Sequence, residues 1–334
     1  RGATGAPAPP RLVVLDSDTL ALGEEAWRPF AALGSLEVHG STAHGEPRAI
    51  VDRCSGAQVV FTNKVPLAAE TLSQLPDLRL VQVLATGYNV VDVAAAKARG
   101  VSVCNVAGYA TRSTAQHAVT LALELCHRVA LHDASVRAGD WVRAPDFWYK
   151  KSDLVELEGL TVGLLGLGAI GRRTGELLRA FGVGRVMAWT PSRRDPPSWP
   201  EFAWASSVEE LFEQSDILSL HCPLSAATER IVGPDMLGRM KPSALLVNTA
   251  RGGLVDEAAL AEALVTGRLA GAAVDVVSEE PMSEARPSPL LQAPNCVITP
   301  HIGWSSLQSR TRLLRMAEAN VARFLAGQSV DAVG

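Results

Sequence analysis

The sequence predicts an α/β protein made of two domains with parallel sheets, and three observations support this. The chain has 334 residues, which is roughly twice the usual domain size of about 150 residues. Short apolar runs alternate with helical segments rich in alanine and leucine, the pattern typical of βαβ units. A glycine-rich turn, GLGAIG, stands between an apolar run and a helical segment at the start of a second series of such units.

The composition is that of a globular protein and argues against several other classes. Hydrophobic residues make up 47% of the chain, charged residues 20%, and the net charge is −4, so we expect no nucleic-acid partner. No apolar run reaches the roughly 18 residues of a membrane span, so we expect no membrane partner. The opening RGATGAPAPP is small and proline-rich, which predicts a flexible tail over residues 1–10 rather than a signal peptide.

The cysteines indicate neither a disulfide framework nor a metal site. They are odd in number, widely spaced and never paired as CxxC. We expect them to pack as small apolar residues, which fits a reducing, cytoplasmic location and a protein without a metal. The positions are Cys54, Cys104, Cys126, Cys222 and Cys296.

The first series of elements forms one α/β unit. Its apolar runs predict strands at 11–16, 57–63, 78–86 and 101–106. Helical stretches are expected between them, around 24–33, 66–75 and 91–99.

A long helical segment at 114–138 leads to the second series. Six strands with intervening helices make a complete doubly wound sheet. These strands are predicted at 160–168, 185–189, 216–222, 244–250, 269–277 and 296–302. A last helix at 306–326 has no strand of its own to pack beside, so we expect it to cross back to the first unit.

The turn GLGAIG has the residues that a dinucleotide site requires. Gly166 permits the tight turn, Gly168 lets the backbone approach a pyrophosphate, and Gly171 lets the helix pack on the strand. Ala169 and Ile170 begin the helix, whose first N–H groups and dipole favour phosphate. A dinucleotide site is therefore predicted, and the alternative is a tight turn without a ligand.

The segment after the next strand bears on which dinucleotide binds. An acidic residue there would hold the ribose hydroxyls of NAD, but the strand is followed by Thr190, Pro191, Ser192, Arg193 and Arg194. A hydroxyl and two guanidiniums suit a 2′-phosphate, so the predicted cofactor is NADP. In the alternative, both arginines belong to a solvated loop and the cofactor is NAD.

Three polar side chains follow three strands of the second series and form the predicted catalytic group. They are Arg251, Glu280 and His301. The carboxyl ends of strands in an open α/β sheet face the ligand crevice, so the three are expected to converge. A guanidinium binds a carboxylate bidentately, an imidazole exchanges a proton near neutral pH, and a carboxylate behind it fixes its tautomer. Taken singly, each residue also fits an ordinary salt-bridge, loop or core role.

Five stretches resemble, in order and spacing, the signatures of the D-isomer-specific 2-hydroxyacid dehydrogenases. They are GLLGLGAIG, DILSLHCPL, LLVNTARGGLVDEAAL, AGAAVDVVSEEP and NCVITPHIGW. The resemblance extends from about residue 11 to residue 328. Within the family, FTNKVPL (61–67) and the stretch 83–106 look most like the glycerate dehydrogenase and hydroxypyruvate (glyoxylate) reductase group.

The resemblance implies roles for individual residues. Arg251 would bind and polarise a 2-oxo acid, His301 would be the acid/base, and Glu280 would support His301. Asp275 and the backbone of Thr249 and Ala250 would contact the nicotinamide end of the cofactor. The remaining implied positions are His221, Cys222, Pro223, His301 and Gly303 in the cofactor groove, and Ala85, Thr86, Gly87, Asn63 and Lys64 in the substrate pocket.

The resemblance also implies two Rossmann-like domains, one inserted into the other. A flavodoxin-like catalytic domain of residues 11–106 plus 305–330 would bind substrate, and residues 107–304 would form the NAD(P)-binding domain. The helix from Thr114 resembles the one through which family members dimerise, so a homodimer is expected, with a plain core helix as the alternative. The loop beyond it carries Trp141, Phe147, Trp148 and Tyr149, which either reach toward a partner's active site or pack on the surface.

The predicted activity is NAD(P)-dependent reduction of a small 2-oxo acid, of the hydroxypyruvate or glyoxylate type, to the D-2-hydroxy acid. Two other interpretations stay open. One is a corepressor-type binding protein that senses the dinucleotide. The other is a dehydrogenase for another small anion, such as phosphite, formate or a phosphonate-bearing oxo acid, which Lys64 near the substrate loop would favour.

Overall fold

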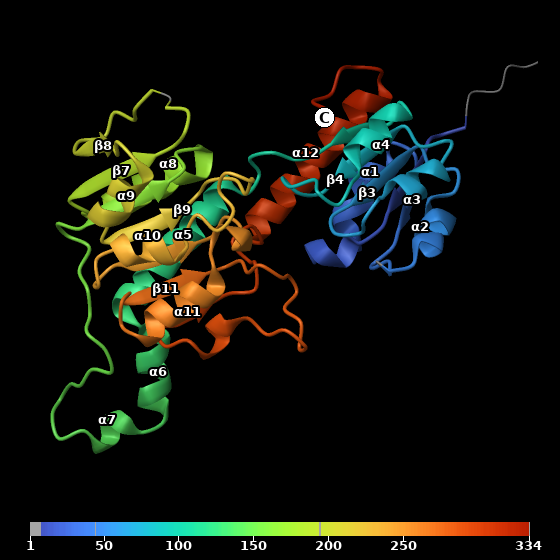
Figure 1. Ribbon diagram of the computed structural model, residues 1–334. Coiled ribbons are helices and arrows are strands. Elements are labelled where there is room, and N and C mark those ends of the chain that lie inside the picture. The colour runs from blue at the N-terminus through green and yellow to red at the C-terminus, as the bar shows by residue number, and fades with distance from the viewer. Residues whose placement is uncertain (1–7, 44, 194, 334) are drawn as a thin grey trace, which may run out of the picture. The chain divides into compact units, whose positions relative to one another are not determined.

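The chain forms two compact units in the computed structural model, which describes residues 8–43, 45–193 and 195–333. The first unit comprises Arg1–Ala110 and Ser305–Gly334, and the second comprises Thr111–Trp304 (Figure 1). Residues 1–7 of the predicted tail lie outside the described residues. Pro10 already belongs to the first unit, because its carbonyl accepts a hydrogen bond from the Ser35 N–H at 2.9 Å.

The first unit contains a five-stranded parallel sheet. Its strand order, β2-β1-β3-β4-β5, is flavodoxin-like, and the family resemblance implied a flavodoxin-like domain here. Strands β3 and β4 are buried along their whole length, as expected for apolar parallel strands that are covered on both faces. The strands are β1 (Arg11–Val14), β2 (Ser35–Val38), β3 (Val59–Thr62), β4 (Leu80–Val83) and β5 (Ser102–Cys104).

Helices from both ends of the chain complete this unit. The C-terminal helix α12 (Leu307–Leu325) packs here, and the Arg310 guanidinium donates to the Ala21 carbonyl at 2.8 Å. Ser306 begins α12 by accepting the Ser309 N–H on its hydroxyl, an ordinary N-cap. The other helices are α1 (Arg28–Ala31), α2 (Pro47–Cys54), α3 (Ala69–Ser73), α4 (Val93–Ala98) and the 3₁₀ turns Ser17–Leu20 and Glu24–Trp27.

The second unit contains a seven-stranded parallel sheet in the order β12-β11-β10-β9-β6-β7-β8. Successive strands run outward from β6 in one direction and from β9 in the other, so the topological switch point lies between β6 and β9. The two parallel sheets confirm the predicted α/β fold class. The strands are β6 (Thr161–Leu165), β7 (Arg185–Trp189), β8 (Phe202–Trp204), β9 (Ile217–Leu220), β10 (Leu245–Asn248), β11 (Gly271–Val274) and β12 (Cys296–Ile298).

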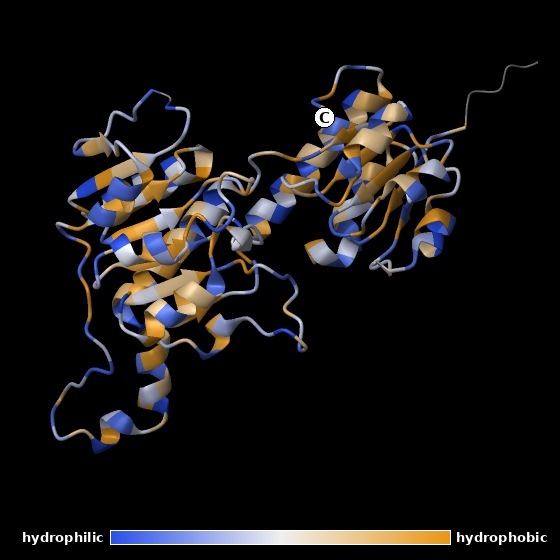
Figure 2. Cartoon of the chain, in the orientation of Figure 1, coloured by the Kyte–Doolittle hydropathy of each residue, from blue (hydrophilic) through white to orange (hydrophobic). Residues whose placement is uncertain are grey.

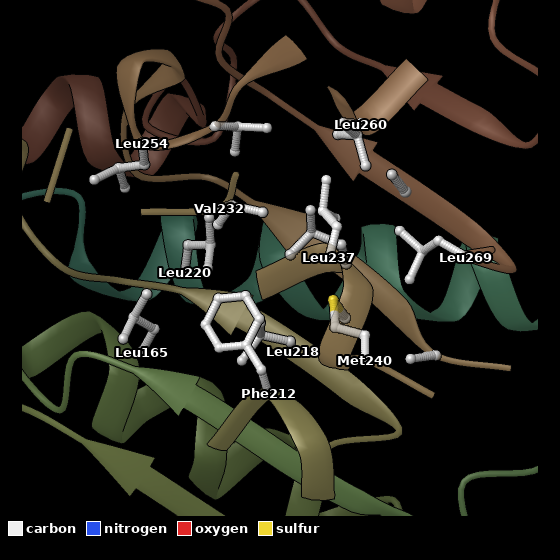
Figure 3. Close-up of a cluster of buried hydrophobic side chains, with 14 of the residues drawn as sticks. Leu165, Phe212, Leu218, Leu220, Val232, Leu237, Met240, Leu254, Leu260 and Leu269 are labelled. Carbon is white, nitrogen blue, oxygen red and sulfur yellow. The ribbon is translucent and has the colours of Figure 1, made fainter. Parts of the chain in front are cut away.

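Helices cover both faces of the second sheet. Helix α5 (Thr111–His127) contacts α8 (Ala169–Ala180), β10 and β11. On another face, side chains such as Phe212, Leu218 and Met240 pack together between sheet and helices (Figure 3), and Figure 2 shows the apolar colouring of the central strands. The remaining helices are α6 (Val129–Arg137), α7 (Asp140–Arg143), α9 (Val208–Gln214), α10 (Pro234–Arg239), α11 (Glu257–Val265) and the 3₁₀ turns Gly252–Leu254 and Pro289–Gln292.

The structure corrects several secondary-structure predictions. Strands β2 and β8 were not predicted, and both are edge strands without a fully buried residue. The single helix predicted at 114–138 is two helices, because Arg128 adopts a left-handed conformation (φ 49°) between α5 and α6. None of the helices in the described residues is long and apolar enough to cross a membrane.

Candidate active site

The glycine-rich turn lies at the switch point of the second sheet, between β6 and α8. Gly166 has a φ of 101°, and a Cβ there would lie 2.7 Å from the Cys222 nitrogen at the end of β9. A Cβ on Gly171 would lie 2.3 Å from the Gly166 oxygen. The fold itself therefore requires both glycines. Gly168 differs, because no described atom lies within 4 Å of the Cβ it would carry, so its side faces open space.

The segment after β7 carries the residues predicted to choose the cofactor. Thr190 directly follows β7 and is partly buried, whereas Ser192 and Arg193 are exposed. The Arg193 guanidinium donates to the Ala205 carbonyl at 2.8 Å and lies 5.8 Å from the centre of the Trp204 ring. Arg194 lies outside the described residues.

The end of β9 brings His221, Cys222 and Pro223 beside the glycine-rich turn. His221 Nε2 lies 2.9 Å from the buried Ser219 hydroxyl. Burial lowers the pKa of His221 to about 4, so its imidazole is neutral near neutral pH. Burial also raises the pKa of the Cys222 thiol to about 11. This side of the turn is therefore uncharged at neutral pH.

Arg251 follows β10 in a turn that the buried Asn248 side chain holds. Asn248 Oδ1 accepts the Ala250 N–H at 3.0 Å, and its Nδ2 donates to the Arg251 carbonyl at 2.9 Å. The exposed Arg251 guanidinium donates to the Ala250 carbonyl at 2.7 Å. A Cβ on Gly252 would lie 1.9 Å from the Val277 carbonyl carbon. Glycine therefore lets the Arg251 turn pack against the segment that leads to Glu280.

Glu280 and His301 form a direct pair. His301 Nδ1 lies 2.6 Å from Glu280 Oε2, and each side chain is about one-third exposed. Glu280 Oε1 accepts the Val277 N–H at 3.0 Å, which fixes the carboxylate from behind. Because a carboxylate only accepts hydrogen bonds, the imidazole donates through Nδ1, and Nε2 is the nitrogen left for proton exchange.

The strand register explains why these groups lie at one edge of the sheet. In β10, β11 and β12, Asn248, Val274 and Ile298 are aligned neighbours in the parallel ladders. Arg251 and His301 each lie three positions beyond the last aligned residue of their strands, and Asp275 lies one position beyond. All therefore follow the carboxyl ends of adjacent strands.

Asp275 is buried and serves as a hydrogen-bond acceptor for the His301 segment. Its carboxylate accepts the N–H groups of Ile302 and Gly303 at 2.9 and 2.8 Å. The sequence did not predict that His117 of α5 also reaches this carboxylate, with Nε2 3.2 Å from Asp275 Oδ1. The two residues are far apart in the chain, and a histidine within a helical pattern gives no signal of such a contact.

The predicted substrate residues belong to the first unit and follow its adjacent strands β3 and β4. The Asn63 and Lys64 N–H groups donate to the buried Asp16 carboxylate at 2.9 and 2.6 Å. Asn63 is buried, and its side-chain amide donates to Thr19, while the Lys64 side chain is exposed.

The loop after β4, Ala85–Thr86–Gly87, is also fixed within the first unit. The Ala85 carbonyl accepts the Val106 N–H, and the Thr86 hydroxyl donates to the Val106 carbonyl, both at 3.0 Å. The loop thus has a defined conformation within its own unit.

The residues at the edge of the second sheet fit a dinucleotide. Gly168 leaves room in front of α8, and the first N–H groups of that helix have no partner within it. The Thr249 hydroxyl oxygen is buried and finds no hydrogen-bond partner among the described residues. Space beside a helix start and a polar atom that lacks a partner are what a bound pyrophosphate and nicotinamide would use.

Comparisons with known proteins agree with this geometry. Residues 119–303 match the family described as D-isomer specific 2-hydroxyacid dehydrogenase, NAD binding domain. A hydroxypyruvate reductase of Blautia hydrogenotrophica is 40% identical over 323 residues, covering 97% of this chain and 99% of the relative. A glycerate dehydrogenase of Methylorubrum extorquens is 39% identical, covering 86% and 88% of the two chains.

A solved structure shares the fold over nearly the whole chain. It is an NADPH-dependent glyoxylate/hydroxypyruvate reductase of Sinorhizobium meliloti in complex with NADP and malonate, with 28% identity and a TM-score of 0.80, covering 98% of this chain and 97% of that one. The resemblance predicted from the sequence motifs is confirmed. The protein therefore belongs to the D-isomer specific 2-hydroxyacid dehydrogenase family of NAD(P)-binding oxidoreductases.

Proposed function

We propose that the protein reduces a small 2-oxo acid, of the hydroxypyruvate or glyoxylate type, to the D-2-hydroxy acid with NADPH as the donor. The observation that supports this best is the hydrogen-bonded Glu280–His301 pair. Like Arg251 and the dinucleotide turn, this pair comes after the carboxyl ends of strands in the second sheet. The relatives that are named hydroxypyruvate reductase and glycerate dehydrogenase support the choice of substrate.

His301 acts as the proton donor in the direction of reduction. A bound NADPH would supply the hydride that reaches the carbonyl carbon. The carbonyl oxygen gains negative charge as this happens, and the protonated His301 gives it a proton from Nε2. Glu280 holds Nδ1 and so keeps Nε2 directed away from itself. In the oxidative direction the same nitrogen removes the hydroxyl proton.

Arg251 binds the substrate and draws off developing charge. Its guanidinium is exposed on a turn that the Asn248 side chain holds by two hydrogen bonds. The N–H donors of this guanidinium can therefore bind both the carboxylate and the carbonyl oxygen of a 2-oxo acid. The loop of Ala85, Thr86 and Gly87 would bind the substrate carboxylate from the first unit, with Asn63 and Lys64 nearby. This assigns residues 11–106 and 305–330 to the catalytic domain and 107–304 to the cofactor domain.

The preference for NADP rests on the segment after β7. Thr190 carries no charge to repel a 2′-phosphate, and the exposed Ser192 and Arg193 follow it. The Sinorhizobium relative is NADPH-dependent. Initial rates with NADPH and NADH at equal concentrations test the assignment, and a strong preference for NADH would contradict it.

A substrate panel tests the proposed reaction. Glyoxylate, hydroxypyruvate, pyruvate and phosphonopyruvate would each be offered with NADPH, and phosphite and formate with NADP. We expect the highest kcat/KM for hydroxypyruvate or glyoxylate. Faster turnover of phosphonopyruvate, phosphite or formate would assign the site to another anion. Tight dinucleotide binding without turnover of any of them would favour a binding protein.

We also propose that the protein is a homodimer formed through the arm, which we define as residues 129–154. Val142 is 90% exposed and Phe147 is 86% exposed, and Trp148 and Leu154 of the same arm are also exposed. Figure 2 shows both apolar and hydrophilic colouring on α6 in this arm. A second copy would cover these side chains, which are large for a solvated loop.

A cytoplasmic location is proposed from the thiols. All five cysteines are free, as expected in a reducing compartment. Cell fractionation with an antibody against the chain would test this.

A further inference from the structure

Asp275 holds three consecutive residues of the segment that carries the proposed proton donor. Its backbone carbonyl accepts the His301 N–H at 2.8 Å. Its carboxylate accepts the Ile302 N–H on Oδ1 at 2.9 Å and the Gly303 N–H on Oδ2 at 2.8 Å. A single residue at the end of β11 thereby fixes the backbone on both sides of the His301 side chain.

The backbone of His301 needs such support. Its φ is 53°, in the left-handed region that residues with a side chain disfavour. A residue in that region persists when its surroundings over-determine it, and such residues gather at functional sites. The three N–H groups that Asp275 accepts constrain this position, and the Thr299 carbonyl also accepts the His301 N–H at 3.0 Å. The direction of the imidazole therefore depends on where the Asp275 carboxylate lies.

Helix α5 fixes that carboxylate and the same segment from one side. His117 Nε2 lies 3.2 Å from Asp275 Oδ1 and 3.0 Å from the Thr299 hydroxyl. Ser113, one turn earlier on the same helix face, donates its hydroxyl to the Gly303 carbonyl at 2.7 Å. Two side chains of α5 thus contact both ends of the segment, at Thr299 and Gly303, and one of them also contacts the Asp275 carboxylate.

The hydrogen positions in this cluster follow from the donors. The Thr299 hydroxyl has one hydrogen, which it donates to Asp275 Oδ1 at 2.6 Å. Its oxygen is then an acceptor toward His117, so the hydrogen of His117 lies on Nε2. Burial by itself would raise the pKa of Asp275, but hydrogen bonds from His117, Thr299, Gly303 and Ile302 outweigh burial and lower it. The carboxylate is therefore ionised and accepts from all four groups.

The packing leaves little freedom for this arrangement. A Cβ on Gly303 would lie 2.9 Å from Asp275 Oδ2 and 3.4 Å from His117 Cδ2. The Asp275 side chain is 2% exposed and that of His117 is 17% exposed. The cluster is thus nearly closed to water, so a lost hydrogen bond would not be replaced easily.

We propose that His117, together with Thr299, is a positioning residue that holds the Asp275 carboxylate in place and thereby sets the direction of the His301 imidazole. This rests on the proposed function, because it assumes that His301 transfers the proton. His117 does not touch the reacting atoms; it acts through Asp275 and the backbone of residues 301–303.

Two substitutions of His117 distinguish the role of its hydrogen-bond donor from the role of its side-chain volume. His117→Gln keeps an N–H donor close to the place of Nε2, whereas His117→Leu fills the space without a donor. We expect His117→Leu to lower kcat by about 10- to 100-fold with little change in substrate KM. His117→Gln should stay close to the wild-type kcat. Thr299→Val should resemble His117→Leu, and Thr299→Ser should resemble the wild type.

The solvent isotope effect gives a readout that a merely structural role would not move. If the imidazole is misdirected, proton transfer becomes slower, so the ratio of kcat in H₂O to kcat in D₂O rises in His117→Leu and not in His117→Gln. A structural defect alone would lower the melting temperature and the active fraction and leave this ratio unchanged. Thr120→Ala is the control on the same helix, because the Thr120 hydroxyl bonds the helix's own Gln116 carbonyl.

Amide hydrogen exchange tests the inference without any activity. The Ile302 and Gly303 amides should exchange faster in His117→Leu than in the wild type or in His117→Gln. The inference is overturned if His117→Leu keeps the wild-type kcat and exchange rates, or if Gln and Leu at this position are equally impaired. If the wild-type protein reduces no 2-oxo acid, the proposed function fails, and the exchange rates still decide whether His117 holds the segment.

Discussion

At the scale of single residues, the Glu280–His301 pair leads to different expectations for its two members. The imidazole contributes the atom that exchanges a proton, while the carboxylate fixes the direction of the ring and places a negative charge behind it. Removing the first removes the reaction step. Replacing the second by its amide leaves an oxygen that still accepts from Nδ1.

We therefore expect His301→Ala to lower kcat by about 10²- to 10⁴-fold while NADPH still binds. Glu280→Gln should cost less, because the hydrogen bond to Nδ1 is kept and only the charge behind the imidazole is lost. Steady-state kinetics and a titration of NADPH fluorescence separate turnover from binding. Nearly normal turnover in His301→Ala would contradict the proposed proton transfer.

His221 predicts a pH-dependent stability. Its pKa in the folded protein is about 4, below the ordinary 6.5, so the unfolded chain takes up a proton on this residue before the folded protein does. The associated stability is fully present above about pH 6.5 and is lost as the pH falls toward 4. The full difference corresponds to about 3 kcal/mol, and the partial exposure of the residue reduces it.

Urea unfolding of the wild type and of His221→Gln, at several pH values between 7 and 4, measures this contribution. The variant should lose less stability on acidification, so the free energy of unfolding of the variant minus that of the wild type should rise as the pH falls. Parallel curves for the two proteins would show that burial does not shift the titration of His221.

At the scale of elements, the glycine-rich turn and the Arg251 turn show two different uses of glycine. The Cβ that Gly168 lacks would face open space, whereas the Cβ that Gly252 lacks would lie inside the backbone of Val277. Gly168 also has extended backbone angles (φ −76°, ψ −167°) that alanine adopts without strain. The same substitution, glycine to alanine, should therefore have different consequences at the two positions: it should affect ligand binding at Gly168 and stability at Gly252.

Gly168→Ala should leave the melting temperature unchanged and weaken NADPH binding by about tenfold, or about 1.4 kcal/mol, because the methyl group fills the space of the pyrophosphate. Gly252→Ala should lower the free energy of unfolding by about 3 kcal/mol because the backbone must move. Calorimetry on the two variants gives both quantities. Unchanged cofactor affinity in Gly168→Ala would argue against a dinucleotide in front of α8.

The elements also show where prediction from sequence succeeds and where it fails. Central strands such as β9 and β10 are continuous apolar runs and were recognised, together with the polar residues that follow them. Edge strand β2 (SLEV) is only four residues long, has mostly exposed residues and pairs on one side only, so its short polar–apolar alternation is a weak strand signal. The break between α5 and α6 occurs at Arg128, where neither a glycine nor a proline indicates the end of a helix.

The candidate site, like the fold, could be predicted only in part from the sequence. Residues that follow parallel strands share one edge of the sheet, so the positions of Arg251, Glu280 and His301 could be inferred from their place in the chain. The contacts of His117 with Asp275 and Thr299 join residues from a helix and a strand that are far apart in the sequence. Only the packing of α5 against the sheet brings them together.

At the scale of the whole molecule, the arm of residues 129–154 is the expected contact between two copies. Its apolar side chains would be costly to leave in water in a monomer. Exposed valines elsewhere, such as Val265 at the end of α11, are single and need no partner. The arm and Val265 therefore offer a test and its control.

Val142→Glu with Phe147→Glu should convert the proposed dimer into a monomer, because two carboxylates on each copy would have to be buried without partners. Val265→Glu should leave the dimer intact. Sedimentation velocity measures both. A double variant that sediments like the wild-type protein would place the interface elsewhere or exclude a dimer.

The chain enters and leaves the second unit at neighbouring points, since the Ser113 hydroxyl bonds the Gly303 carbonyl. A segment whose two ends lie together can be excised, or exchanged for the equivalent segment of a relative, by cutting the backbone in only two places. In evolution, this lets the second unit, which contains the proposed cofactor site, be exchanged as a whole. A change of nucleotide preference could then be acquired by recombination as a block, leaving the other half of the protein with its original sequence.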